Sequence, residues 1–405
     1  MSVRAYAAHL GVTVATVSNW SSRGARAHLR TETQQLLDID LARAPAGVHE
    51  RFEAILAGTS DGRATVAPGV LGPAEVFATP GTAGFPGTGI DGGVVTAAMR
   101  AFRVADSRIG GAPLYAAVIA YLKSHVGPRL VDGTDETSTP DAFCAAASML
   151  EMAGWMAHDR GDDDTALAHF SRALSFTAVG DDRHLRAHVL GSMSHLAAHL
   201  RRPHETIQLA QRGQDVLRDA PPHPPLMARL LALEARGAAG LGDLAKPLVL
   251  LAQAEAELAK AVSLGLPPTP WVSHYDEASL ASDAGRCLRR LGDLAETRRQ
   301  AERIIGLRPA QRARSRGLGQ LMLANVLVAQ GVVDEASAVT ARALDSGLPL
   351  HSAPVARGLR TLGLALAPHK ASAAVGEVHA RLTETLDQQS IWAGNPGSSG
   401  TGLRT

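Results

Sequence analysis

A turn signature recurs at intervals of about forty residues through the middle of the chain. It occurs at Gly161-Asp162, Arg201-Arg202-Pro203, Gly242-Asp243, Gly292-Asp293 and Gly331, with separations of 40, 41, 50 and 39 residues. Each turn follows an apolar helical stretch and precedes another that ends in small residues. One such hairpin cannot bury its apolar face alone, whereas stacked hairpins can. The spacing therefore predicts an all-α solenoid with a concave groove, which is a surface typical of proteins that bind peptides, proteins or a second copy of themselves.

Small residues around these turns fall at repeated offsets. Gly154 precedes the first turn glycine by seven residues, and Ala166, Phe170 and Ala173 follow it by five, nine and twelve. The last unit repeats the pattern with Ala324, Ala336, Thr340 and Ala343. The offsets resemble those of the tetratricopeptide repeat, in which small side chains let two helices approach closely, although the usual period is only about 34 residues. We therefore expect longer helices or loops, with the weakest match near Pro247.

The N-terminal residues 3–24 indicate a different small structure. Apolar residues at helical spacing flank Gly11, namely Tyr6, Ala7 and Leu10 before it and Val14, Val17 and Trp20 after it. Glycine suits a left-handed turn because it has no Cβ to clash there. Thr13 is placed to cap the second helix with its hydroxyl. This pattern predicts two short helices joined by a tight turn.

The same stretch resembles the lambda-repressor-like, XRE-type regulators through Leu10-Gly11-Val12-Thr13, Thr16-Val17-Ser18 and Trp20. The resemblance implies a helix-turn-helix whose second helix enters the major groove of double-stranded DNA. Matched by position, the DNA-binding residues are Thr13, Val14, Ala15, Thr16, Ser18, Asn19, Arg23 and Arg26. The apolar Val14 and Ala15 suit thymine methyl groups, and Thr16 suits a phosphate. The first thirty residues also hold four arginines and no acidic residue, as expected beside DNA.

Two positions depart from the family pattern. Only Met1 and Ser2 precede Val3, so the family's first helix is expected to be missing or encoded upstream, and Ser21 replaces the usual acidic residue. Two functions therefore stay open. One is a DNA-binding transcriptional regulator, homodimeric because a short helix-turn-helix usually needs paired half-sites, whose repeats sense a peptide, protein or small molecule. The alternative is a helical-repeat adaptor or signalling protein with a degenerate head.

The domain order follows from composition. Residues 1–57 form the predicted helix-turn-helix domain, and residues 58–93 a Gly/Pro-rich linker that cannot bury enough apolar surface to offset chain entropy. Residues 94–390 form the tetratricopeptide-like domain, and residues 391–405 a disordered tail.

Composition also excludes several classes of protein. A net charge of +1 over 405 residues does not indicate a polyanion partner for the whole chain. Two distant cysteines, Cys144 and Cys287, do not make a disulfide scaffold and fit a reducing cytoplasm. Without a run of about twenty apolar residues, neither membrane insertion nor secretion is expected. We find no nucleophile elbow, paired-carboxylate or metal-protease motif, and expect no enzyme activity and no cofactor.

Four histidines are the main candidates for local chemistry: His184, His188, His195 and His199. On one helix they would span about 60° of its face. Pairs four residues apart can chelate a metal, and clustered imidazoles can sense pH. The interpretation we favour is a helix that lines a solvated groove, with no metal.

Two further segments have alternative interpretations. Residues 271–277 combine two aromatic side chains, a histidine and two carboxylates, and either contact a ligand at the groove rim or, as we favour, anchor a long loop between repeats. The basic residues Arg298, Arg299, Arg312, Arg314 and Arg316 are expected on solvated faces, the alternative being a second nucleic-acid contact.

Replacing Arg23 and Arg26 with Ala tests the predicted phosphate contacts. Each lost cation should weaken affinity for a labelled DNA duplex and reduce the slope of log affinity against log salt by about 1. Fluorescence anisotropy at several salt concentrations measures both quantities. Unchanged affinity together with an unchanged slope would contradict the contacts.

Overall fold

The computed structural model describes residues 92–109, 111, 113–127, 140–264, 272–310, 312–348 and 352–393. The predicted helix-turn-helix, its DNA-binding residues and the linker up to residue 91 lie outside these ranges. All the described residues belong to one compact unit. They form helices and connecting turns without a strand, which confirms the predicted all-α repeat architecture for this part of the chain.

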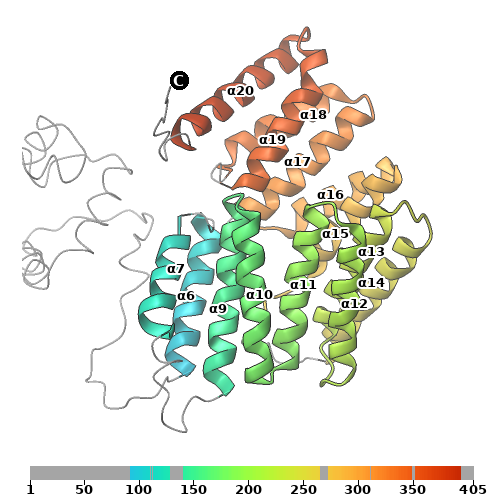
Figure 1. The fold of residues 1–405 in the computed structure, drawn as a ribbon. Coiled ribbons are helices and arrows are strands. Elements are labelled where there is room, and N and C mark those ends of the chain that lie inside the picture. Colours follow the sequence, from blue (N-terminus) through green and yellow to red (C-terminus); the bar gives the residue numbers. More distant parts are fainter. Residues whose placement is uncertain are drawn as a thin grey trace, which may run out of the picture. The chain divides into compact units, whose positions relative to one another are not determined.

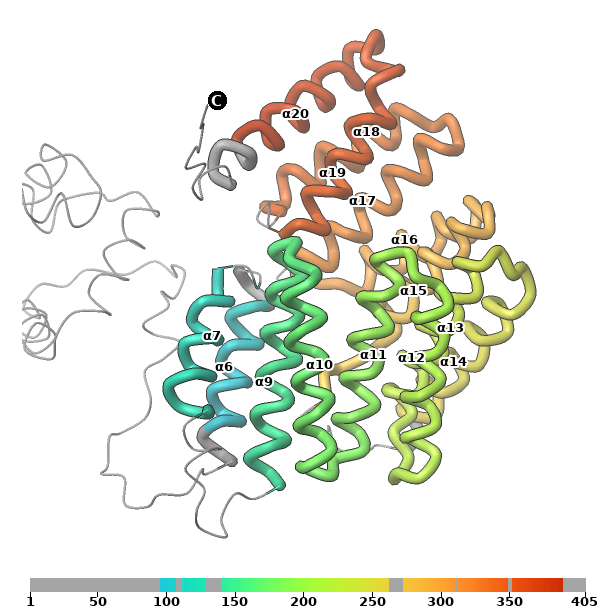
Figure 2. The backbone as a smooth tube through the Cα atoms, in the orientation of Figure 1, coloured from blue at the N-terminus to red at the C-terminus, as the bar shows by residue number. Residues whose placement is uncertain are grey.

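The helices form a series of antiparallel hairpins (Figures 1 and 2). The first helices of the hairpins are α9 (Pro140–Asp159), α11 (Arg183–His199), α13 (Pro224–Gly240), α15 (Glu277–Leu291), α17 (Ala313–Ala329) and α19 (Ala353–Leu366). Their partners are α10 (Asp163–Gly180), α12 (Pro203–Arg218), α14 (Lys246–Leu264), α16 (Leu294–Leu307), α18 (Val333–Asp345) and α20 (Ala373–Ala393). Each first helix packs against its own partner and against the first helix of the next hairpin, so the first helices make one continuous layer.

Shorter elements complete the series. Before the first hairpin, α6 (Gly92–Ile109), α7 (Tyr115–Tyr121) and η2 (Leu122–Val126) pack against α9. The 3-10 helix η3 (Ala367–His369) connects α19 to α20. The helix α20 continues to Ala393, so it includes the first three residues that composition assigned to the tail. No helix in the described ranges is both long and apolar enough to cross a membrane.

The predicted turns are confirmed by their backbone conformation. Left-handed φ values of 85°, 82°, 84° and 78° occur at Gly161, Gly242, Gly292 and Gly331. Arg201 occupies the equivalent place with φ of 58°. Where aspartate follows the glycine it also starts the next helix, as Asp162 does by accepting a hydrogen bond from Thr165 N at 3.1 Å. The Gly-Asp pair therefore ends one helix and caps the next.

Small residues allow the two helices of a hairpin to approach closely, as the sequence predicted. Gly154 of α9 faces the ring of Phe170 on α10, and this ring is fully buried. Ala166 and Ala173 on either side of Phe170 are also fully buried. Near Pro247, where the repeat match is weakest, α14 still forms because proline in a first turn lacks only an N–H that would have no helical partner.

Gly154→Ala should lower the free energy of unfolding by roughly 1–3 kcal/mol. An added Cβ would overlap Cε1 of Phe170 and lie 2.6 Å from its Cδ1, inside a packed core. The matched control is Gly306→Ala in α16, where no atom lies within 4 Å of the added Cβ. Alanine there should be neutral or stabilise the helix by up to about 1 kcal/mol. Urea unfolding measures both, and equal effects would contradict the close approach at Gly154.

Candidate functional site

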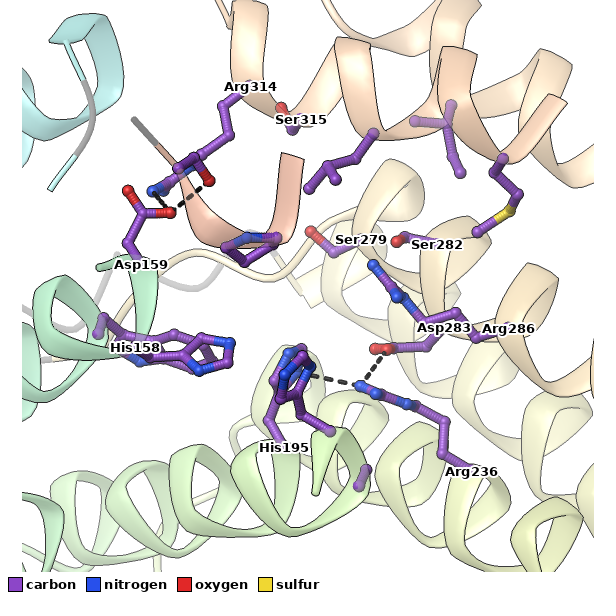
Figure 3. A pocket seen from close by; sticks show the side chains of 18 of the residues that line it. His158, Asp159, His195, Arg236, Ser279, Ser282, Asp283, Arg286, Arg314 and Ser315 are labelled. Atoms are coloured by element: carbon purple, nitrogen blue, oxygen red, sulfur yellow. Dashed lines mark hydrogen bonds and ion pairs between the residues drawn. The ribbon is translucent and has the colours of Figure 1, made fainter. Parts of the chain in front are cut away.

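The layer of first helices borders a cavity of about 1040 Å³ (Figure 3). Most of its lining comes from α6, from all six first helices and from residues 273–275 before α15. The same register faces the cavity in successive repeats. The side chains six residues before each turn residue all line it, namely Trp155, His195, Arg236, Arg286 and Asn325. Side chains at equivalent helical positions share a face, so this one position in each successive repeat contributes a side chain to the cavity wall.

The cavity wall is strongly basic. Among the described residues it carries ten arginines and four acidic side chains, an excess of six positive charges, although the whole chain has a net charge of only +1. A concave surface with charge of one sign attracts ligands of the opposite sign. The wall is therefore a candidate binding surface for an anion.

One part of the wall is a buried hydrogen-bond network. Glu151 Oε1 accepts hydrogen bonds from Ser192 Oγ and Trp155 Nε1, both at 2.6 Å, and lies 3.1 Å from His188 Nε2. Arg229 donates to His188 Nδ1 at 2.7 Å and to Ser192 Oγ at 3.0 Å. Burial lowers the pKa of His188 to about 4, so its ring is neutral and can accept from Arg229. Burial alone would raise the pKa of Glu151, but the surrounding donors and cations lower it below the usual range.

A second network joins the helices α11, α13 and α15 and the residue Tyr275 just before α15. Arg236 Nη1 donates to His195 Nδ1 at 3.1 Å and lies 3.1 Å from Asp283 Oδ1. The hydroxyl of Tyr275 donates to the other oxygen of Asp283 at 3.0 Å. Burial, followed by the charge of Arg236, lowers the pKa of His195, so this ring is also neutral at pH near 7. Arg229 and Arg236 are thus held by other wall residues.

Several cavity arginines have no such partner within the described residues, among them Arg286 and Arg357. Arg286 makes no hydrogen bond or ion pair, and the helices around its cavity-facing side chain, together with repulsion from Arg236, lower its pKa to about 10. Arg357 buries Nε and Nη2 without a hydrogen-bond partner. With a pKa of about 10, Arg286 stays charged at neutral pH. The buried, unpaired nitrogens of Arg357 are costly until an anion compensates them, and the exposed side chain of Arg286 is open to an anion that enters the cavity.

The ends of the repeat series meet at Asp159, the last residue of α9. Its Oδ1 accepts a hydrogen bond from Ser352 Oγ at 2.7 Å and lies 3.2 Å from Arg314 Nη1, while Oδ2 accepts from Gly111 N at 3.3 Å. Arg314 also bonds Asp106 of α6 at 3.4 Å. Since α19 packs against α9, the first and last hairpins both contribute to the same cavity wall.

The histidine prediction is only partly confirmed. All four residues lie on the single helix α11, but only His188, His195 and His199 line the cavity. His184 instead lies 2.8 Å from the carbonyl oxygen of Pro221, away from the cavity. The helix lines a groove, as favoured, although His188 is a buried network member rather than a solvated side chain.

The segment before α15 anchors a loop, as the sequence analysis favoured, and it also lines the cavity. Asp276 caps α15 through Ser279 N at 2.9 Å and pairs with Arg308 Nη1 at 2.6 Å, which confirms the anchoring role. Ser273, His274 and Tyr275 line the cavity, so this segment also supplies part of its wall.

The expectation of solvated faces is corrected for two of the arginines. Arg298 and Arg299 pair with glutamates on exposed helix faces, as expected. Arg314 does not lie on a solvated face, because it bonds Asp106 and Asp159 at the cavity. Arg316 likewise donates to the carbonyl oxygen of Arg308 at 2.7 Å. Arg314 contacts distant elements, which spacing along the chain does not reveal, whereas Arg316 contacts backbone carbonyls at the end of the preceding helix, α16.

Several cavity residues were missed by the sequence prediction, chiefly Glu151, Arg229, Arg236, Arg286 and Arg357. Most stand inside apolar helices, as Arg229 and Arg236 do in α13. A charged side chain within an apolar stretch must reach a partner or water. An isolated charged residue in an apolar helical segment is therefore the sequence feature that could have indicated these positions.

Comparison with known proteins bears on the fold. No family model and no curated protein matches the chain. Among solved structures, the chain is similar to a Rap protein complexed with competence and sporulation factor, with a TM-score of 0.50 and 12% sequence identity. The likeness covers 73% of this chain and 86% of that chain. It supports the helical-repeat architecture.

The pH dependence of stability tests the buried state of His188. In the unfolded chain its ring takes up a proton below about pH 6.5, whereas the folded chain resists protonation until about pH 4, so stability falls as pH drops between them. Between about pH 7 and pH 5 the wild-type chain loses free energy of unfolding because of this ring. In His188→Gln that decrease should be smaller by on the order of 1 kcal/mol. Urea unfolding at both pH values measures this. The control is His184→Gln, on the same helix outside the cavity, which should keep the wild-type dependence of stability on pH. Equal pH dependence in the two variants would contradict a buried, neutral His188.

Proposed function

We propose that this protein is a DNA-binding transcriptional regulator whose helical-repeat cavity binds a short peptide carrying negative charge. The observation behind the peptide assignment is the pair of unpartnered cations, Arg286 and Arg357, in a wall with excess positive charge. The DNA-binding assignment rests on the helix-turn-helix pattern of residues 3–24, with a homodimer expected on paired half-sites in the cytoplasm.

Cavity size and lining favour a peptide over a small metabolite. Pockets for small molecules usually measure roughly 300–1,000 Å³, and this cavity of about 1040 Å³ lies at the upper end. Apolar side chains such as Met152, Leu233 and Met322 alternate with its arginines. A short peptide offers both apolar side chains and carboxylates, so it can contact both the apolar and the basic parts of the cavity wall. The Rap protein of similar fold was itself solved with a bound factor, which supports binding as a use of this architecture.

A peptide carboxylate would pair with Arg286 of α15 and Arg357 of α19. Hydrogen bonds between guanidinium and carboxylate are charge-assisted and geometrically specific. Because these arginines belong to different hairpins, a ligand that contacts both favours one arrangement of those hairpins over others. Differential affinity of this kind is what allows a ligand to shift a conformational equilibrium. We propose that the chain acts through this binding rather than through catalysis.

The test uses the full-length chain and a library of randomised short fluorescent peptides, each made with a free and with an amidated C-terminus. Acidic peptides should bind best. Arg286→Gln and Arg357→Gln should each weaken the best binder about tenfold or more, because a charged hydrogen bond contributes roughly 1.5–3 kcal/mol. The control is Arg212→Gln, an exposed arginine on the outer helix α12, which should leave affinity unchanged.

A preference for neutral or basic peptides, or equal affinity in all three variants, would overturn the peptide assignment. Adding the best binder to the labelled DNA duplex then separates the two functions. A regulator changes its DNA affinity when the peptide binds. An adaptor with a degenerate head binds the peptide but does not bind the duplex.

A further inference from the structure

Three side chains beside the cavity converge from three different helices. His158 lies in the last turn of α9, Asp163 is the first residue of α10, and His199 is the last residue of α11. One donor atom from each lies within 4.8 Å of the other two. We propose that His158, Asp163 and His199 bind a divalent transition-metal ion of the zinc class, with an open coordination position facing the cavity.

The distances suit such an ion after small side-chain rotations. Asp163 Oδ1 lies 2.6 Å from His158 Nδ1, and Oδ2 lies 3.9 Å from His199 Nε2. Donor atoms about 2.0–2.2 Å from zinc in tetrahedral geometry are separated by roughly 3–3.5 Å, which falls between these two values. The two imidazole rings are 4.7 Å apart at 81°, so they approach the common point from different directions.

The donor set is also chemically suitable. Two imidazoles and one carboxylate are ligands that zinc and its neighbours accept, and sites with three protein ligands leave a position for water or another ligand. Side-chain exposures of 7%, 17% and 28% for His158, Asp163 and His199 keep the donors mostly out of bulk water.

This ligand set differs from the pairs of histidines that the sequence offered on one helix. Arg229 and Arg236 already occupy the Nδ1 atoms of His188 and His195, so those rings are committed to the wall networks. His158 and His199 both line the cavity, which places the open coordination position there. The nearby charge of Arg357 opposes a cation, so we expect a dissociation constant on the order of micromolar rather than nanomolar.

The experiment is a titration of the tag-free full-length chain with Co²⁺, whose visible absorption reports a protein site of low coordination number. We expect saturation at one equivalent and displacement of Co²⁺ by Zn²⁺. His199→Gln and Asp163→Asn should each weaken Co²⁺ binding at least tenfold, because each variant removes one of three protein ligands. His184→Gln removes an imidazole from the same helix, away from the cluster, and should bind as the wild type does.

Absence of saturable Co²⁺ absorption in the wild-type chain would overturn the proposal, as would equal affinity in the wild type and both ligand variants. Circular dichroism establishes that each variant is folded before its affinity is compared, and the two ligand variants provide independent answers. No peptide is present in these titrations. Their outcome is therefore separate from that of the peptide experiment, and either proposal can fail alone.

Discussion

The described part of the chain depends on helix pairs that approach closely because the residues between them are small. Gly154 against the buried ring of Phe170 is the clearest example within a hairpin. Between hairpins, Gly213 of α12 lies against Leu230 of α13, where a Cβ would come within 2.7 Å of the leucine. Interiors packed at this density tolerate little added volume. The spacing of the helices, and with it the position of every cavity side chain, follows from these contacts.

Such packing assigns separate roles to separate faces of each first helix. Small and apolar positions contact the neighbouring helices, which leaves the position six residues before each turn residue to face the cavity. A repeat protein places equivalent positions side by side along the series, so a few polar substitutions per hairpin accumulate into one charged wall. This explains how a chain of nearly balanced charge contains a strongly basic cavity.

The partners of the cavity arginines decide what the wall can do. Arg229 bonds a neutral histidine and a serine, Arg236 bonds a neutral histidine and Asp283, and both hold the helices of the wall in place. Arg286 and Arg357 lack such partners within the described residues, so they remain available to an anion. The cluster of His158, Asp163 and His199 beside them has the opposite preference, because a carboxylate and two imidazoles whose nearest polar partner is that carboxylate suit a cation. One cavity thus places sites for both signs of charge close together.

The sequence by itself determined the turns and the hairpins, because their causes are local. A glycine that reaches positive φ and an aspartate that caps the next helix are neighbours in the chain, and Gly161-Asp162 shows both effects. It did not determine the cavity. Arg314 and Asp106 meet across 208 residues, and their contact depends on the small rotation that each hairpin adds to the last. Only the tertiary structure sums those rotations, and therefore only it decides which charged side chains face one another.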